Sequence, residues 1–251
     1  MDNVAVTMFH LYEYFEKNGY RSPEEHRNTP AVFARGLKDI DYFDWMTQEP
    51  KHYASFNDAM AHFTFIGAKE IARTYPFSQL PVGASGVTIV DVGGGKGHVL
   101  NEIISLHPSI ATHAVLEDLR SVVSADTLVS PNQVRTQPYN FMAEQQPVKG
   151  ASAYYMRHIL HDWPDSACRT ILQNHVEAMK GHDSRLLLSE LVLGDSGGSP
   201  QKMLRDINMM QLAGKERSEK QWHALLDSAG FRIINIYGRD NATNRYVQGC
   251  A

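Results

Sequence analysis

The chain has 251 residues with 28 acidic and 24 basic side chains, a formal net charge of -4 and a hydrophobic content of 43%. This length is enough for one large α/β domain, and the lack of a basic surplus argues against nucleic acids and membranes as partners, which leaves small molecules. The two cysteines, Cys168 and Cys250, stand far apart without metal-ligand spacing, so we expect no disulfide framework, no zinc site and a cytoplasmic location.

Residues 1–80 are predicted to be helical. The stretch Met1 to Leu11 contains an acid but neither a basic segment nor a sustained apolar run, so it does not have the pattern of a signal peptide. Apolar side chains within residues 41–75 recur at helical spacing on both sides of Pro50, which indicates two helices. The Pro-, Gly- and Ser-rich segment 76–86 marks the boundary to a second unit.

From residue 81 to residue 251, short β-branched runs alternate with amphipathic stretches. We expect strands at Val87–Val92, Thr112–Glu117, Ala153–Met156, Arg185–Leu191, Phe231–Tyr237 and Asn244–Cys250. A helix is predicted over Pro164–Lys180, with proline in its first turn and Gly181 as the stop signal. This alternation implies an α/β fold with a doubly wound, mostly parallel sheet. The last two runs are joined by a short turn and are expected to form an antiparallel hairpin.

The strongest local signal is a buried strand that runs directly into a glycine-rich turn, DVGGGKG at 91–97. Such a turn lets the backbone approach a ligand closely. A dinucleotide-binding pattern would need glycine where His98 stands, and a phosphate-binding loop would need Gly-Lys-Ser/Thr, so neither NAD nor a triphosphate is expected. The next strand ends near Asp118, about twenty residues after the turn, where a carboxylate can accept both hydroxyls of a ribose. S-adenosylmethionine fits this pattern, with Asp91 and the amides of the turn near its amino-acid part.

A second polar cluster, RHILHDWPD at 157–165, follows the predicted strand Ala153–Met156. In a doubly wound sheet the ligand crevice opens at the carboxyl ends of the strands near the reversal of strand order. If this strand neighbours Val87–Val92, His161 faces the glycine turn across that crevice. A neutral imidazole can accept the proton of a phenol, whose pKa is near 10, so His161 is a candidate general base. A metal site at His158 and His161 is not expected, since nothing else nearby has ligand spacing.

Five segments together resemble one known family: DVGGGKG, Asp118, RHILHDWPD, LLLSELVL at 186–193 and residues 206–231. They look like the caffeic-acid-type O-methyltransferases, class I S-adenosylmethionine-dependent enzymes, and in particular their fungal natural-product branch. The resemblance covers essentially the whole chain. It implies a Rossmann-like sheet of seven strands and metal-independent methyl transfer to a phenolic or enolic hydroxyl of a small natural product. Residues 81–251 would form the catalytic domain, and residues 1–80 would contribute to the substrate pocket.

Carried over residue by residue, the resemblance implies three groups of site residues. The cofactor S-adenosylmethionine would be held by Asp91, Gly93, Gly94, Gly95, Asp118, Asn140, Phe141 and Arg157. His161 would accept the proton, flanked by the acids Glu190 and Glu216. Glu216 is the expected orienter, because a carboxylate on one imidazole nitrogen fixes the tautomer and stabilises the imidazolium. The family positions that line the phenol pocket are Phe56, Met60 and Met209, for which ordinary core packing is an equally good explanation.

The sequence departs from the family pattern at two positions. Asn140 stands where the family commonly has an aspartate to hold adenine, and an amide oxygen can still accept a hydrogen bond from the adenine amino group. Arg157 stands where relatives often carry lysine, and both side chains supply a positive donor.

Two other functions stay open at this point. A protein of this fold could catalyse a pericyclic cyclisation or a dehydration, or it could be a catalytically silent cofactor-binding subunit. Retention of His161, Glu190 and Glu216 favours methyl transfer. The resembled enzymes also carry an additional N-terminal, winged-helix-like domain that mediates dimerisation. These 251 residues lack it, so we expect a monomer or a weak homodimer.

Overall fold

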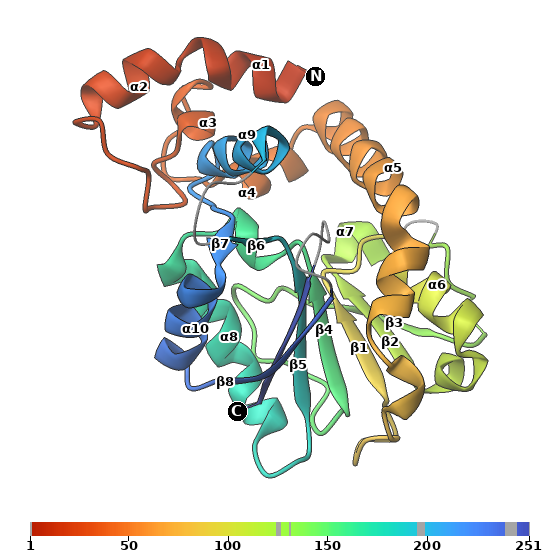
Figure 1. Ribbon diagram of the computed structural model, residues 1–251. Coiled ribbons are helices and arrows are strands. Elements are labelled where there is room, and N and C mark those ends of the chain that lie inside the picture. The colour runs from red at the N-terminus through yellow and green to blue at the C-terminus, as the bar shows by residue number, and fades with distance from the viewer. Residues whose placement is uncertain (1, 124–126, 131, 195–198, 239–244, 251) are drawn as a thin grey trace.

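The computed structural model describes residues 2–123, 127–130, 132–194, 199–238 and 245–250, and a seven-stranded sheet forms the centre of this described part (Figure 1). The strand order is β3-β2-β1-β4-β5-β9-β8. The strands are β1 (Ile89–Val92), β2 (Ala114–Asp118), β3 (Arg135–Pro138), β4 (Ala153–Arg157), β5 (Arg185–Glu190), β8 (Arg232–Tyr237) and β9 (Arg245–Cys250). All pairs from β3 to β5 are parallel, and β9 runs antiparallel to both of its neighbours. The expected doubly wound α/β fold with a final hairpin is therefore confirmed.

The six predicted strands correspond to β1, β2, β4, β5, β8 and β9, with ends that differ by at most two residues. Asn244, the first residue of the last predicted run, lies outside the described residues. The edge strand β3 was not predicted, because its sequence, Arg-Thr-Gln-Pro, is polar and largely exposed and so carries no apolar alternation. A small second sheet of β6 (Val192–Leu193) and β7 (Arg217–Ser218) was not predicted either.

Helices cover both faces of the sheet. One face carries α8 (Asp165–Met179) and α10 (Glu219–Ser228), and the other carries α5 (Pro50–Thr74) and α6 (His98–Leu106), as Figure 1 shows. Successive side chains of a strand point to opposite faces, so Val90 and Val92 pack against α8 while Ile89 packs against α5 and α6. Each fully buried aliphatic side chain of this kind contributes about 1.5–3 kcal/mol. Three short helices lie in the connections between strands: α7 (Arg120–Val123) and the 3-10 helices η2 (Pro108–His113) and η3 (Leu160–Asp162).

The first 80 residues are helical within the described part, as predicted. They form α1 (Asp2–Phe9), α2 (Leu11–Lys17), α3 (Pro30–Phe33), α4 (Tyr42–Thr47), α5 and η1 (Phe77–Gln79). The two helices predicted around Pro50 are α4 and α5. Pro50 begins α5, where its missing N–H would have no helical partner anyway. Asp41 begins α4 by accepting a hydrogen bond from the Asp44 N–H at 2.9 Å.

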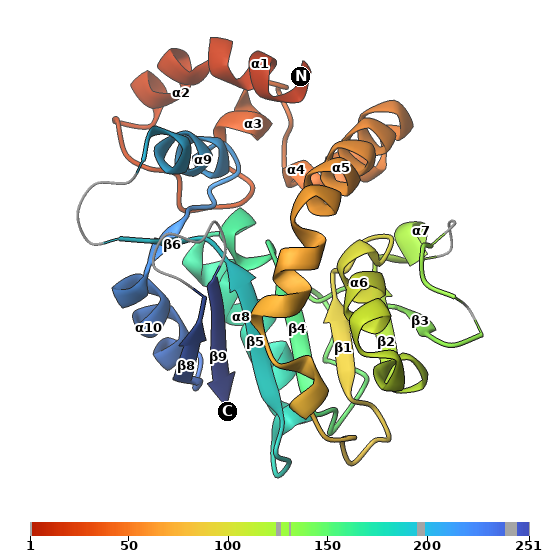
Figure 2. The ribbon, with the colours of Figure 1, turned by 45° about the vertical axis from the view of Figure 1, so that its right-hand side comes forward.

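Helix α9 (Pro200–Met210) lies between the N-terminal helices and the small sheet of β6 and β7 (Figure 2). It is tied to the N-terminal helices by the Ala31 N–H, which donates to the Gln211 carbonyl at 3.0 Å. Among the described residues no helix is both long and apolar enough to cross a membrane.

Candidate active site

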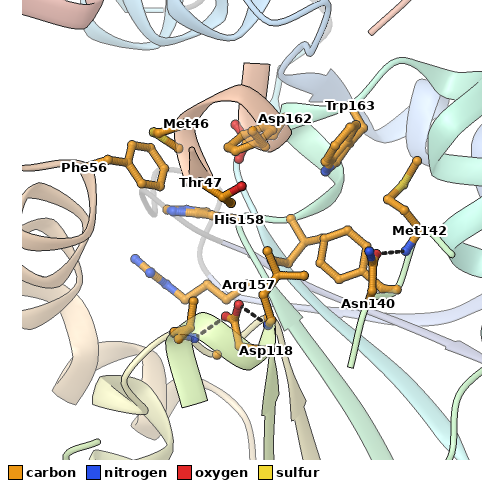
Figure 3. A pocket seen from close by; sticks show the side chains of 18 of the residues that line it. Met46, Thr47, Phe56, Asp118, Asn140, Met142, Arg157, His158, Asp162 and Trp163 are labelled. Carbon is orange, nitrogen blue, oxygen red and sulfur yellow. Dashed lines mark hydrogen bonds between the residues drawn. The ribbon is translucent and has the colours of Figure 1, made fainter. Parts of the chain in front are cut away.

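A cavity of about 510 Å³ opens at the carboxyl ends of β1, β2 and β4. The strand order reverses between β1 and β4, which is where doubly wound sheets form ligand crevices. In Figure 3, Asp118 and Asn140 lie on one side of this cavity, and Met46, Thr47 and Phe56 from the N-terminal helical segment lie on the other. The cavity therefore joins a wall built by the sheet to a wall built by the first 80 residues.

The glycine turn lines the sheet side of the cavity. Gly93 and Gly97 have φ values of +68° and +83°, a conformation that is costly for other residues, and α6 begins directly after Gly97. The N–H groups of Gly93 and Gly94 both donate to the Glu117 carbonyl, at 2.8 and 3.1 Å, which pins the turn to β2. A Cβ atom at Gly94 would lie 2.5 Å from Oδ2 of Asp91, so the turn can pack on this acid only with glycine there.

Two acids lie beside the turn. Asp118 accepts hydrogen bonds from the N–H groups of Gly95 at 2.8 Å and of Leu119 at 2.7 Å. Burial raises the pKa of Asp118, and these two donors oppose the rise. Asp91 is 3% exposed, and its Oδ2 is buried without a hydrogen-bond partner. Burial and the neighbouring charge of Asp118 raise the pKa of Asp91 to about 7, against the opposing effect of Arg157.

All eight residues predicted to hold the cofactor line this one cavity. Besides the glycine turn and the two acids, they include Asn140, Phe141 and Arg157. The Asn140 Oδ1 atom accepts a hydrogen bond from the Met142 N–H at 3.0 Å (Figure 3). The Phe141 ring packs edge-on against Trp163 with the ring centres 6.3 Å apart. The structure thus brings together residues that are spread over 67 positions of the sequence, from 91 to 157.

His161 lies in the turn that follows β4, next to the cavity rather than among its lining residues. Its side chain is 10% exposed, with Nδ1 3.1 Å from Oε1 of Glu216 and Nε2 3.5 Å from Oδ1 of Asp162. Burial lowers the pKa of His161, but the negative charges of Asp162, Glu190 and Glu216 outweigh burial and raise the pKa to about 9. The surrounding carboxylates therefore favour the protonated imidazole in the ligand-free protein.

Glu190, the other predicted acid, holds the backbone of the turn before His161. Its Oε1 accepts hydrogen bonds from the N–H groups of Ile159 at 3.1 Å and Leu160 at 3.0 Å. Burial raises the pKa of Glu190 to about 7, although the nearby His161 lowers it. Glu216 thus touches the imidazole, whereas Glu190 accepts hydrogen bonds from the backbone.

Several cavity residues were not predicted. His158 lines the cavity, and its ring stacks on that of His161 with the centres 4.9 Å apart. Its φ of +52° is unusual for a residue other than glycine, and such strain persists where the surroundings over-determine the backbone. The remaining unpredicted lining residues come from both the N-terminal helical segment and the sheet side, and include His26, Arg27, Phe43, Met46, Thr47 and Trp163. Of these residues only Trp163 had a local signal in the sequence, the His-Asp-Trp motif.

The three predicted substrate residues fare differently. Phe56 lines the cavity and packs edge-on against Phe43, with the ring centres 6.1 Å apart. Met209 is half-buried on α9 and is not among the lining residues. Met60 belongs to α5, but its side chain lies outside the described part of the chain. No group of three or more His, Cys, Asp or Glu side chains that could hold a metal ion occurs within the residues that the structure describes.

The chain is similar to a known protein family and to several known proteins. Residues 22–232 match the profile of a family described as "O-methyltransferase domain". The O-methyltransferase asqN of Emericella nidulans is 40% identical over 222 residues, which cover 86% of this chain and 74% of that protein. The O-methyltransferase agiB of Aspergillus flavus is 39% identical over 262 residues, which cover 97% and 88%. The O-methyltransferase penK of Penicillium thymicola is 37% identical, and the chain spans only 56% of its length.

Solved structures share the fold. The crystal structure of OxaC has a TM-score of 0.88 at 24% identity over 99% of this chain and 63% of its own. The structure of LepI in complex with S-adenosylmethionine has a TM-score of 0.81 at 26% identity over 98% of this chain and 64% of its own. A structure titled "A Pericyclic Reaction enzyme" has a TM-score of 0.83, also at 26% identity, over 98% of this chain and 64% of its own.

Proposed function

The chain belongs to the O-methyltransferase domain family, and on that premise we propose that it transfers a methyl group from S-adenosylmethionine to a phenolic or enolic hydroxyl of a small natural product. The observation that carries the proposal is the single cavity, which joins Asp91, Asp118 and the glycine turn to an aromatic wall beside His161. In this proposal residues 1–80 are the helical segment that completes the substrate pocket, and residues 81–251 are the catalytic domain.

The residues of the sheet side fit this cofactor. The buried Oδ2 of Asp91 lacks a hydrogen-bond partner and so suits a cationic or N–H group of a ligand. Asp118 stands where a carboxylate can accept from ribose hydroxyls, and Asn140 offers an amide at the cavity wall. The cavity volume lies in the range of small-molecule sites. When bound, the cofactor supplies an electrophilic methyl group on a positively charged sulfur. The S-adenosylmethionine complex of LepI supports this assignment.

His161 is the proposed proton acceptor. Glu216 accepts from Nδ1, so Nε2, which lies 3.5 Å from Oδ1 of Asp162, is the nitrogen proposed to take the proton of the acceptor hydroxyl. Phenols titrate near pH 10, so removal of this proton makes the oxygen a far better nucleophile. The carboxylates around His161 favour the imidazolium, and a cation bound in the neighbouring cavity would oppose it, since like charges disfavour each other. Binding of a cationic ligand is therefore expected to bring His161 toward its neutral, basic form.

The other wall is suited to a flat ring. Phe43 and Trp163 lie with their ring centres 5.2 Å apart, and Phe56 and Met46 extend the same surface. Aromatic rings and a flexible thioether adapt to planar ligands. Holding a ring so that its hydroxyl meets the methyl group in line can supply much of the rate enhancement.

The proposal is tested by incubating the purified chain with methyl-labelled S-adenosylmethionine and a panel of catechols, hydroxyindoles and cyclic enols. We expect transfer of the label to at least one member, unchanged by a metal chelator. His161→Gln is expected to lower the rate at least about 10²-fold, because general base catalysis contributes about that much. His223→Gln, an exposed histidine on α10, is the matched control and should leave the rate unchanged.

Other outcomes distinguish the alternatives. Conversion of a substrate without consumption of the labelled methyl group would support a pericyclic or dehydration reaction instead. Cofactor binding without any conversion across the panel would support a catalytically silent subunit. Loss of activity with chelator would contradict metal independence.

A further inference from the structure

Arg217 is a fully buried arginine that directly follows Glu216, the acid on His161. Its exposed fraction is 0%, and Arg217 itself is not among the residues that line the cavity. Nη1 donates to the Leu160 carbonyl at 2.9 Å, and Nη2 donates to the Trp163 carbonyl at 3.0 Å. These two carbonyls bracket His161 and Asp162. One rigid, planar group therefore holds both ends of the turn that carries the histidine.

The charge of this buried guanidinium is balanced. Nη2 and Nε donate to Oδ1 of Asp165 at 2.7 and 3.2 Å, and the guanidinium carbon lies 5.2 Å from the centre of the Trp222 ring. Lys215 contacts the other carboxylate oxygen of Asp165 at 2.8 Å. Well-packed apolar residues often give a folded protein as much stability as a buried ion pair at the same place. The donor geometry toward the two carbonyls therefore points to a task beyond holding the fold together.

The backbone around Arg217 contacts the same turn. The Lys215 N–H donates to the His161 carbonyl at 2.8 Å, and a Cβ atom at Gly214 would overlap that carbonyl and the backbone of Asp162. The Glu216 N–H in turn donates to Oδ1 of Asp206 on α9 at 2.8 Å. Residues 214–217, which we call the support segment, thus hold three of the four carbonyls from Leu160 to Trp163 and the imidazole itself.

We propose that Arg217 is a positioning residue of the methyl-transfer site, which fixes the turn 160–163 so that His161 keeps its contact with Glu216 beside the cavity. The proposal deepens the proposed function and rests on it for the role of His161. Its central contact, however, is a property of the ligand-free protein and can be measured without a methyl acceptor.

The titration of His161 reports on this contact. The groups that face its ring are Asp162 and the stacked His158 on its own turn, Glu216 of the support segment and, through its charge, Glu190 of β5. Removing a positive charge from Arg217 would by itself raise the pKa of a nearby histidine. Loosening the turn would lower that pKa, because Nδ1 would lose Glu216. The two explanations predict changes of opposite sign.

The experiment uses Arg217→Lys, which keeps the charge but cannot span both carbonyls, and Arg217→Met, which loses both. The pKa of His161 is followed by NMR of its ring carbon-bound proton, assigned with His161→Gln, and S-adenosylhomocysteine binding is measured by calorimetry. We expect the pKa of His161 to fall by about one unit in both variants. The dissociation constant should change less than about twofold, because Arg217 touches no cavity residue except the Trp163 backbone. Arg232→Lys, at an exposed position on β8, is the control and should change neither value.

An unchanged pKa of His161 in the folded variants would overturn the proposal. So would a pKa that rises in Arg217→Met and stays constant in Arg217→Lys, since only charge would then matter. If Arg217→Met does not fold, Arg217→Gln replaces it, because the shorter amide removes the same positive charge and cannot span both carbonyls. A chain that transfers no methyl label but shows the fall in pKa would refute the proposed function and retain the positioning role.

Discussion

The Nδ1 atom of His161 lies 3.1 Å from the Oε1 atom of Glu216, although 55 positions separate the two residues in the sequence. The Glu216 side chain is buried, and its other carboxylate oxygen has no hydrogen-bond partner. The interaction of this carboxylate with His161 is therefore strong, because little water screens it. Because Glu216 is on Nδ1, Nε2, which lies 3.5 Å from Oδ1 of Asp162, is the nitrogen that we propose for proton transfer.

Replacing Glu216 tests this pairing. We expect Glu216→Gln to lower kcat about 10²-fold, because the amide cannot stabilise the imidazolium that forms when His161 takes the proton. Glu177→Gln, an exposed glutamate on α8 whose contact is with Lys180, is the control and should leave kcat unchanged. The measurement is transfer of the methyl label at saturating cofactor, and a kcat within twofold of wild type in Glu216→Gln would contradict the role.

The pH dependence of methyl transfer follows from the charges around His161. These charges raise its pKa to about 9 in the ligand-free protein, and only the neutral form accepts a proton. We therefore expect the rate to increase with pH and to level off, with a midpoint between about 6.5 and about 9, because a bound cation lowers the pKa. Glu216→Gln removes a negative charge and should move the midpoint to lower pH. A rate that falls as pH rises through this range would rule out His161 as the base.

The glycine turn can be tested with a matched pair of alanines. In Gly94→Ala the new Cβ would meet Asp91 Oδ2 and Leu116 Cδ1, each at 2.5 Å, so the turn or the acid must move. We expect the affinity for S-adenosylhomocysteine to fall at least about tenfold and the free energy of unfolding to fall by about 1–3 kcal/mol. In Gly194→Ala nothing lies within 4 Å of the new atom, so both quantities should stay as in wild type. Calorimetric titration measures the affinity, and thermal unfolding measures the stability. Equal affinities for the two variants would contradict the assignment of the glycine turn to cofactor binding.

Asn140 offers a gain-of-affinity test. Its Oδ1 accepts from the Met142 N–H, a contact that an aspartate can keep. We expect Asn140→Asp to bind S-adenosylhomocysteine about fivefold more tightly, because a charge-assisted hydrogen bond is stronger than a neutral one. Asn140→Ala, which loses both the acceptor and the contact to Met142, should bind more weakly. If aspartate and alanine weaken binding alike, the side chain at this position does not meet the adenine amino group.

Local patterns predicted most of the sheet and the glycine turn with its two acids. Strand, glycine turn and acid follow one another within short stretches, and the spacing from Asp91 to Asp118 already implies neighbouring parallel strands. The edge strand β3 was not predicted, because it has no buried face. Met209 was assigned to the pocket from the family resemblance; in the structure it is half-buried on α9 and is not among the residues that line the cavity.

By itself, the sequence determined the α/β alternation and the glycine turn that follows a buried strand, with its two acids, because both depend on residue types at short, regular spacings; the resemblance to a family pointed to the other proposed cofactor residues and to His161. Only the tertiary structure decided that Glu216 reaches the imidazole, that Arg217 holds the turn around it and that residues such as Arg27 and Phe43 line the opposite wall. These contacts join segments that lie tens of residues apart. They form only when the support segment and the N-terminal helices pack against the carboxyl ends of the strands, which is a consequence of burial across the whole fold rather than of any local pattern.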